Sequence, residues 1–209
     1  MLVCHPYSIK NKKPYESQTK TTAYFSKANE RVFVSRTKFH DLQMFENIDS
    51  LWHEIENYRK ESQNHTKPFT ITNRKKKHNN DVYTYTFTQK DSLSTKAILV
   101  KNILKKGTLF QLKTLVDTIA KPSTFVTQFY NTFTPLDTLL GKPVLTDKTD
   151  IFFSALQAND SIVMSNRDLI KFNNSHVNKL ISIIKNFDFP ENKKFVKLDL
   201  IRDLIALDN

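Results

Sequence analysis

The amino-acid sequence predicts an α+β fold in which an antiparallel sheet flanked by helices is followed by a helical C-terminal segment. Over roughly the first 120 residues, apolar and polar side chains mostly alternate, which is typical of strands with one buried face. Two stretches of the N-terminal part instead place apolar residues three or four positions apart, which indicates amphipathic helices. From residue 146 onward only this helical spacing recurs.

The predicted sheet domain has the element order β-β-α-β-β-β-β-α. Its first two strands, 22–25 and 31–36, are separated by a polar turn, and a helix capped by Asn47 or Asp49 follows them. Four further strands alternate apolar and polar residues, and the tract 73–81 between the first two of these is expected to be a long polar loop. These four strands are expected around 69–71, 83–87, 95–104 and 108–116.

Gly107 closes the clearest predicted hairpin, which joins the last two strands. Glycine adopts the positive φ of a tight turn without steric cost, so Gly107 is expected to supply that conformation. The helix that follows carries an aromatic face over 125–133, and Pro135 ends it.

The C-terminal segment is predicted to hold four helices of about 10–16 residues that form two antiparallel pairs. Cap signals at 159–161 and at Ser175 begin the second and third helices, and Pro190 separates the third from the fourth. Helix pairs of this size are the unit that HEAT-like solenoids stack. The predicted organisation is an N-terminal extension, a sheet domain, a linker and a HEAT-like helical segment, at 1–19, 20–133, 134–145 and 146–209.

Glycine is scarce, since the chain has two in 209 residues. A P-loop and a dinucleotide-binding fingerprint each need at least two glycines in a short window, but Gly107 and Gly141 stand 34 positions apart. The same shortage excludes the Gly-x-Ser-x-Gly elbow of α/β-hydrolases. The composition therefore excludes these nucleotide-binding and hydrolase sites.

The residue types that carry catalysis or bind metals form no complete motif. Cys4 is the only cysteine, which excludes an intrachain disulfide and a cysteine-based metal cluster. A zinc-protease helix needs a second histidine four positions after the first. Four positions after His53 the chain has Asn57 instead, so the second zinc ligand is missing. The acidic pair within 147–150 is interpreted as complementing a helix dipole, and His176 near a helix start is expected at the surface. We therefore expect no catalytic residue, cofactor or metal, and no enzyme.

Positive charge is concentrated in the first part of the chain. The net charge is +11, and residues 1–150 hold 24 basic and 14 acidic side chains. The densest cluster precedes an aromatic strand, a combination that surfaces binding single-stranded nucleic acid use. The simpler interpretation is a solvated loop beside a core-facing strand. The residues of this candidate anion or nucleic-acid patch are Arg74, Lys75, Lys76, Lys77, Tyr83 and Tyr85.

The last predicted helix ends on the apolar run 204–207, and no polar capping helix follows it in the sequence. The end of a helical repeat without such a cap exposes an apolar face. We therefore expect this face to bind another protein, a second copy of the chain or a neighbouring domain. Its predicted residues are Leu198, Ile201, Leu204 and Ile205.

Two stretches, 107–114 and 125–133, resemble the closing strand and helix of PsbP/Mog1-like domains. Those domains often end in a strand reading Tyr-x-Leu and a helix reading Phe … Ser-Phe. At the corresponding places this chain has Phe110-Gln111-Leu112 and Thr132-Phe133. The stretch 129–156 is similar to an uncharacterised segment of large bacterial envelope proteins, some with a TraB/GumN-type domain upstream and HEAT-like helices downstream. The resemblance implies a non-enzymatic binding or assembly module.

No secretion signal is recognisable in the sequence, and the clean apolar run 97–100 is far shorter than a membrane span. A cytoplasmic location is the default expectation, and the envelope or periplasm is expected if the chain is part of a larger bacterial protein. The leading hypothesis is a non-catalytic binding or scaffolding module that acts through protein–protein contacts. The alternative is a basic protein that binds single-stranded nucleic acid through residues 73–87.

Overall fold

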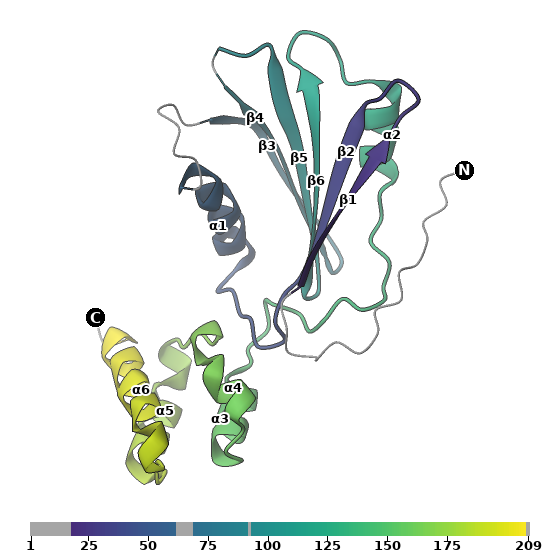
Figure 1. The fold of residues 1–209 in the computed structure, drawn as a ribbon. Helices are drawn as coiled ribbons and strands as arrows, with labels where there is room; N and C mark the ends of the chain where they lie inside the picture. The colour runs from purple at the N-terminus through teal and green to yellow at the C-terminus, as the bar shows by residue number, and fades with distance from the viewer. Residues whose placement is uncertain (1–17, 62–68, 92, 208–209) are drawn as a thin grey trace. The chain divides into compact units, whose positions relative to one another are not determined.

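The structure is a computed structural model that describes residues 18–61, 69–91 and 93–207 (Figure 1). These residues form two compact units, and each is described by itself. The sheet unit comprises the described residues of 1–41 and 51–143, and the helical unit those of 42–50 and 144–209. The presence of a six-stranded sheet and several α-helices confirms the predicted α+β class. Cys4 and most of the predicted extension lie outside the described residues.

The sheet has the strand order β1-β2-β6-β5-β4-β3, and every neighbouring pair is antiparallel. The element order along this part of the chain is β-β-α-β-β-β-β-α, as predicted. The chain forms β1 and β2, leaves the sheet through a helix, and returns as a four-stranded meander whose last strand pairs with β2. The strands are β1 (Gln18–Phe25), β2 (Arg31–Lys38), β3 (Thr70–Asn79), β4 (Val82–Lys90), β5 (Lys96–Lys105) and β6 (Thr108–Asp117).

Helix α2 (Thr124–Thr132) covers one face of the sheet over β2, β6 and β5. Ser123 caps its start, since the Ser123 Oγ accepts a hydrogen bond from the N–H of Val126 at 3.2 Å. Val126 and Tyr130 are buried, and the Tyr130 hydroxyl donates to the carbonyl oxygen of Leu99 at 2.8 Å. The sheet residues buried in this core are Val32, Val34, Ile103, Phe110 and Leu112.

Helix α1 (Ile48–Glu61), most of which belongs to the sheet unit, covers the opposite face over β3 and β4. Asn47 caps it, because the Asn47 Oδ1 accepts the N–H of Ser50 at 2.9 Å. Trp52 packs against Tyr85 of β4 with ring centroids 5.5 Å apart. Side chains alternate along a strand, so the residues that flank Tyr85 point to the other face.

The tract 73–81 was predicted as a loop, but most of it belongs to the edge strand β3. It pairs with β4 up to Asn79, with an irregularity between Thr72 and Lys75, and the turn is formed by Asn80 and Asp81. Most side chains of this strand are exposed on both faces, so its sequence lacks the apolar alternation that marks other strands. Lysines on an edge strand also hinder its pairing with another chain.

The β5–β6 turn has the predicted position but a different conformation. Lys106, with φ 52°, adopts the positive φ that was expected of Gly107. Gly107 is required by packing instead, because a Cβ there would overlap the carbonyl oxygen of Lys142 and lie 3.0 Å from that of Leu140. The Thr108 Oγ1 also donates to the carbonyl of Leu140 at 2.7 Å. Residues 134–143 of the predicted linker therefore belong to the sheet unit, with Leu140 and Lys142 packed against the β5–β6 turn.

The helical unit surrounds its own apolar core. Residues 42–50, which were predicted to lie in the sheet domain, belong to this unit. The Met44 N–H donates to the carbonyl of Leu169 at 3.2 Å, and the Phe45 N–H donates to that of Val144 at 2.9 Å. The core residues include Leu42, Met44, Phe152, Phe153, Leu156, Met164, Ile170, Leu180, Phe189, Val196 and Leu200. The α-helices are α3 (Thr149–Gln157), α4 (Ser161–Ser165), α5 (Val177–Asn186) and α6 (Lys194–Leu207).

Helix α4 is shorter than the predicted 10–16 residues, because it ends at Ser165 and a 3₁₀ turn, Arg167–Leu169, follows it. The carbonyl of Leu169 accepts its hydrogen bond from Met44 rather than from a continuing helix. Ile170 is extended and buried. The long-range hydrogen bond replaces a further turn of helix, and local sequence spacing does not reveal it.

Substitution by asparagine separates the roles of the two glycines, since Asn tolerates positive φ but has a Cβ. Gly107→Asn is expected to destabilise the sheet unit by about 1–3 kcal/mol, because the new side chain overlaps a backbone carbonyl. Gly141→Asn is the matched control and is expected to be tolerated, since Gly141 has φ 70° and its Cβ would meet the flexible side chain of Lys38. Urea unfolding of both variants measures the difference, and equal stability of Gly107→Asn and wild type would contradict the packing role.

Candidate functional site

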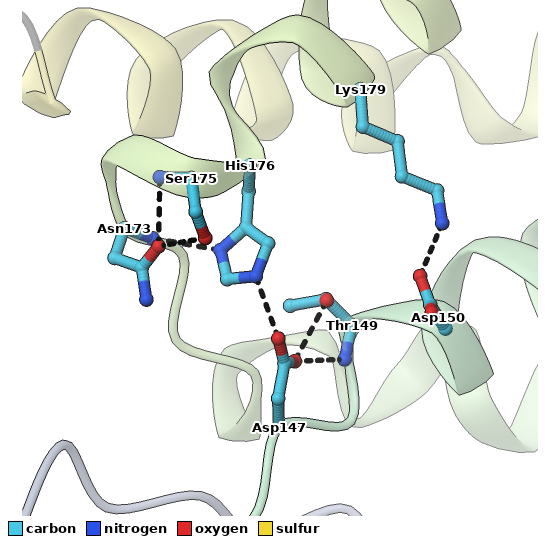
Figure 2. A network of polar contacts seen from close by, with 7 residues as sticks. All are labelled: Asp147, Thr149, Asp150, Asn173, Ser175, His176 and Lys179. Atoms are coloured by element: carbon cyan, nitrogen blue, oxygen red, sulfur yellow. Dashed lines mark hydrogen bonds and ion pairs between the residues drawn. The ribbon is translucent and has the colours of Figure 1, made fainter.

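Asp147 and His176 form the contact of the helical unit that most resembles catalytic machinery (Figure 2). Asp147 lies just before α3, and His176 ends the 3₁₀ turn that precedes α5. The Nε2 of His176 lies 2.8 Å from the Oδ2 of Asp147, and the Asn173 N–H donates to the Nδ1 of His176 at 3.0 Å. Because Nδ1 accepts, the ring proton is on Nε2 and is donated to the carboxylate. Both ring nitrogens are therefore engaged.

This contact lacks the free nitrogen that a catalytic histidine–aspartate pair needs. In such a pair, the second ring nitrogen takes a proton from the nucleophile. In His176 the second ring nitrogen, Nδ1, already accepts the backbone N–H of Asn173. The neighbouring hydroxyl, Ser175 Oγ, donates to the Oδ1 of Asn173 at 2.6 Å instead of to the histidine (Figure 2). Asn173 and His176 form a capping box, and Asp147 links this box to the start of α3. The geometry gives the pair a structural role.

His176 was predicted at the surface, but it is only 7% exposed. Its ring packs edge-on against Phe172, with centroids 6.1 Å apart. A polar ring buried to this degree needs hydrogen-bond partners, which Asn173 and Asp147 provide. The spacing Asn-x-x-His is the sequence signal that could have indicated this, because a capping box joins residues three positions apart.

The two carboxylates at the start of α3 do not converge on a common site. Burial raises the pKa of Asp147, but hydrogen bonds from Thr149 and His176 outweigh it and hold the pKa below its usual value. The Thr149 N–H and Oγ1 donate to the Oδ1 of Asp147 at 2.8 and 2.7 Å. Asp150, in the first turn of the helix, pairs with Lys179 instead (Figure 2). This arrangement agrees with the interpretation of the pair as helix-start residues.

The predicted basic and aromatic patch is divided between the two faces of the sheet. Arg74 forms two hydrogen bonds of 3.1 Å with the carboxylate of Glu56 in α1, and the Tyr85 hydroxyl donates to the same carboxylate. Tyr85 is 1% exposed, and burial together with Glu56 raises its pKa to about 12. The ammonium of Lys76 lies 5.7 Å from the centre of the Tyr85 ring. Arg74 and Tyr85 therefore hold α1 against the sheet, and the Tyr85 ring cannot stack on a base.

The remaining members of the patch behave differently. Tyr83 is half-buried, and its ring stacks on His78 with centroids 4.0 Å apart. Lys75 and Lys77 are exposed and alternate with Lys76, so they lie on the face opposite Tyr85. The structure thus leaves these two lysines accessible without the stacking platform that the sequence suggested.

Helix α6 carries a second exposed surface, on the side that faces away from the helical core. Phe195, Leu198 and Ile205 are 56%, 56% and 59% exposed. Ile201 is half-buried on the same side of the helix, whereas Leu204, predicted to belong to this face, packs against the core. We call Phe195, Leu198, Ile201 and Ile205 the α6 stripe. It contains three of the four residues predicted for a partner face and adds Phe195.

No model of a known protein family matches the chain, and no curated protein matches it. Within the described part of the chain, the structure contains no helix with the length and apolar character needed to cross a bilayer. In the same residues, no group of three or more His, Cys, Asp or Glu side chains is placed to hold a metal ion. His53 and Asn57, of the incomplete zinc motif, contact each other through His53 Nε2 and Asn57 Nδ2 at 2.7 Å.

Thr149→Val removes the hydroxyl donor to Asp147 and is expected to raise the pKa of Asp147 toward its usual value of about 3.9. A carboxyl with a lowered pKa contributes stability that is complete above its unfolded-state pKa and is lost as the pH falls through its folded-state pKa. The variant should therefore lose less stability than wild type on acidification from about pH 4. Carbon NMR titration of the carboxyl measures the shift, and an unchanged midpoint would contradict the role of Thr149.

Proposed function

We propose that this chain is a non-catalytic binding or scaffolding module that acts through protein–protein contacts, with the α6 stripe as its contact surface. The observation that carries the proposal is the exposure of Phe195, Leu198 and Ile205 on a helix whose opposite side is already buried. A surface helix of a globular domain usually has one apolar side, and a second one indicates a further contact.

The stripe offers enough apolar surface for a specific contact. Complete burial of a large apolar side chain contributes about 1.5–3 kcal/mol, so covering three that are more than half exposed is worth roughly 3–5 kcal/mol. Binding energy at protein interfaces is concentrated in a few such central side chains. A partner that covers the stripe would therefore gain most of its binding energy there.

Four of the five charged residues of α6 form ion pairs within the chain, and the fifth, Lys197, has its ammonium 5.6 Å from the centre of the Phe189 ring. Arg202 contacts Asp199 at 3.1 Å, and Lys194 contacts Glu191. The partner therefore needs an apolar surface rather than a complementary charge at this position. An apolar helix face that packs side by side with α6 has the required chemistry.

The two fold families proposed for the units agree with the same function. The PsbP/Mog1-like character of the sheet unit and the HEAT-like character of the helical unit remain proposals. Both would describe modules that bind rather than catalyse, as the resemblance of 107–114 and 125–133 to PsbP/Mog1-like domains implies. In a HEAT-like arrangement, α6 would be the last helix of a stack and would bind the next repeat or a partner protein.

Site-specific photocrosslinking tests this function. A photoreactive phenylalanine analogue at Leu198 in the full chain is expected to form a discrete covalent adduct with another protein, or with a second copy, in cells that express the chain. The matched control position is Ser182, which is exposed on α5. Ile205→Glu should abolish the adduct, because it places a charge in the apolar contact. Crosslinking that is absent, equal at both positions or insensitive to Ile205→Glu would refute the proposal.

A further inference from the structure

One face of β3, β4 and β5 carries lysines and threonines, and we call these residues the lysine strip. Lys75, Thr86 and Lys101 are direct neighbours across the three strands. Lys77 and Thr84 form the adjacent row. Because paired residues share a face, all five side chains lie on the side of the sheet opposite Tyr85. The strip therefore combines segments of three strands, and Lys101 of β5 is far in the sequence from the lysines of β3.

Positive charge in the lysine strip is not balanced by nearby carboxylates. Within the described residues, no ion pair joins Lys75, Lys77 or Lys101 to an acidic side chain. Burial lowers the pKa of Lys101, and the positive charge of Lys77 lowers it further because two ammonium groups repel each other. Lys105, four positions after Lys101 in β5, is paired with Asp137 at 2.7 Å and so marks the end of the unbalanced region. A bound anion would relieve this repulsion.

The side chains of the strip suit phosphate oxygens. Ammonium groups and hydroxyls donate hydrogen bonds to phosphate, and such contacts position a nucleic acid without reading its bases. Base stacking would need an exposed ring, but Tyr85 is buried on the other face and Tyr83 is stacked on His78. Contact through the backbone is therefore favoured over contact through bases.

We infer that the lysine strip binds the phosphate backbone of single-stranded nucleic acid without reading its bases. The last turn of α2 borders the strip, since the Nζ of Lys101 donates to the carbonyl oxygen of Tyr130. The open floor then runs from β3 across β4 to the part of β5 that α2 leaves uncovered, which is two strand spacings or roughly 10 Å. A flexible single strand can follow a floor of this width beside a helix, whereas a rigid duplex meets the helix. This surface is separate from the α6 stripe, so the two proposals stand independently.

Fluorescence anisotropy with the full chain and labelled single-stranded DNA tests the inference. Wild type is expected to bind at about 50 mM salt, with an affinity that falls steeply as salt rises. Lys75→Gln together with Lys77→Gln should reduce the slope of log affinity against log salt by about 1.4. Between about 50 and 200 mM salt, wild type should thus lose about sevenfold more affinity than the variant.

The control variant, Lys27→Gln with Lys121→Gln, removes the same charge at exposed positions outside the strip and should retain the wild-type slope. Circular dichroism verifies that both variants are folded. The inference is overturned by absence of binding at about 50 mM salt, or by an equal loss of slope in the control. It is also overturned by tighter binding of duplex DNA, an acidic peptide or anionic vesicles, or by a strong preference between homopolymers of different bases.

Discussion

The two faces of the six-stranded sheet are covered by two helices that lie on opposite sides and over different strands. Helix α1 packs over β3 and β4, and α2 packs over β2, β6 and β5. Each face therefore keeps a part without a helix, and polar residues occupy it. On the α1 face, Thr19 and Thr37 are hydrogen-bonded at 2.9 Å, and Thr21 and Ser35 at 2.8 Å. Threonine suits such positions because it favours strands and tolerates water.

The placement of α1 and α2 on opposite faces also explains how positive charge is distributed over β3. Residues of β3 alternate between the face that α1 covers and the face that it leaves open. Arg74 contacts Glu56 of α1 and contributes to packing, whereas Lys75 and Lys77 remain exposed on the other side. A cluster that is continuous in the sequence thus becomes a packing contact on one face and a cationic surface on the other.

Sequence periodicity predicted the elements whose burial is regular. The order of strands and helices in the sheet unit and the position of the last hairpin were predictable, because each depends on local spacing or turn chemistry. The helix cap was narrowed to Asn47 or Asp49, and Asn47 provides it. The start of β3 was predicted at 69–71, but its continuation through 73–79 was not, since this polar edge segment is held by pairing with β4 rather than by apolar residues of its own. The assignment of 42–50 to the helical unit depends on Met44 and Phe45, whose partners lie about a hundred positions away in the sequence.

The candidate surfaces were predictable to different degrees. Leu198 and Ile205 could be named because helical spacing assigns them to one side of the last helix. The exclusion of Leu204 needed the actual position of the core, and the inclusion of Lys101 in the lysine strip needed the strand register. The local spacing of Asn173 and His176 could have indicated the capping box, but the second hydrogen-bond partner that lets the His176 ring be buried, Asp147, lies 29 positions away.

The central claim is that the α6 stripe is open to a partner rather than covered by the chain itself. Thermal and urea unfolding of Leu198→Glu combined with Ile205→Glu tests this claim most directly. If the stripe is open, the free energy of unfolding should change by no more than about 0.5 kcal/mol for each substitution, as at other surface positions. A loss of about 3 kcal/mol or more would show that the chain buries these side chains itself, and would contradict the account.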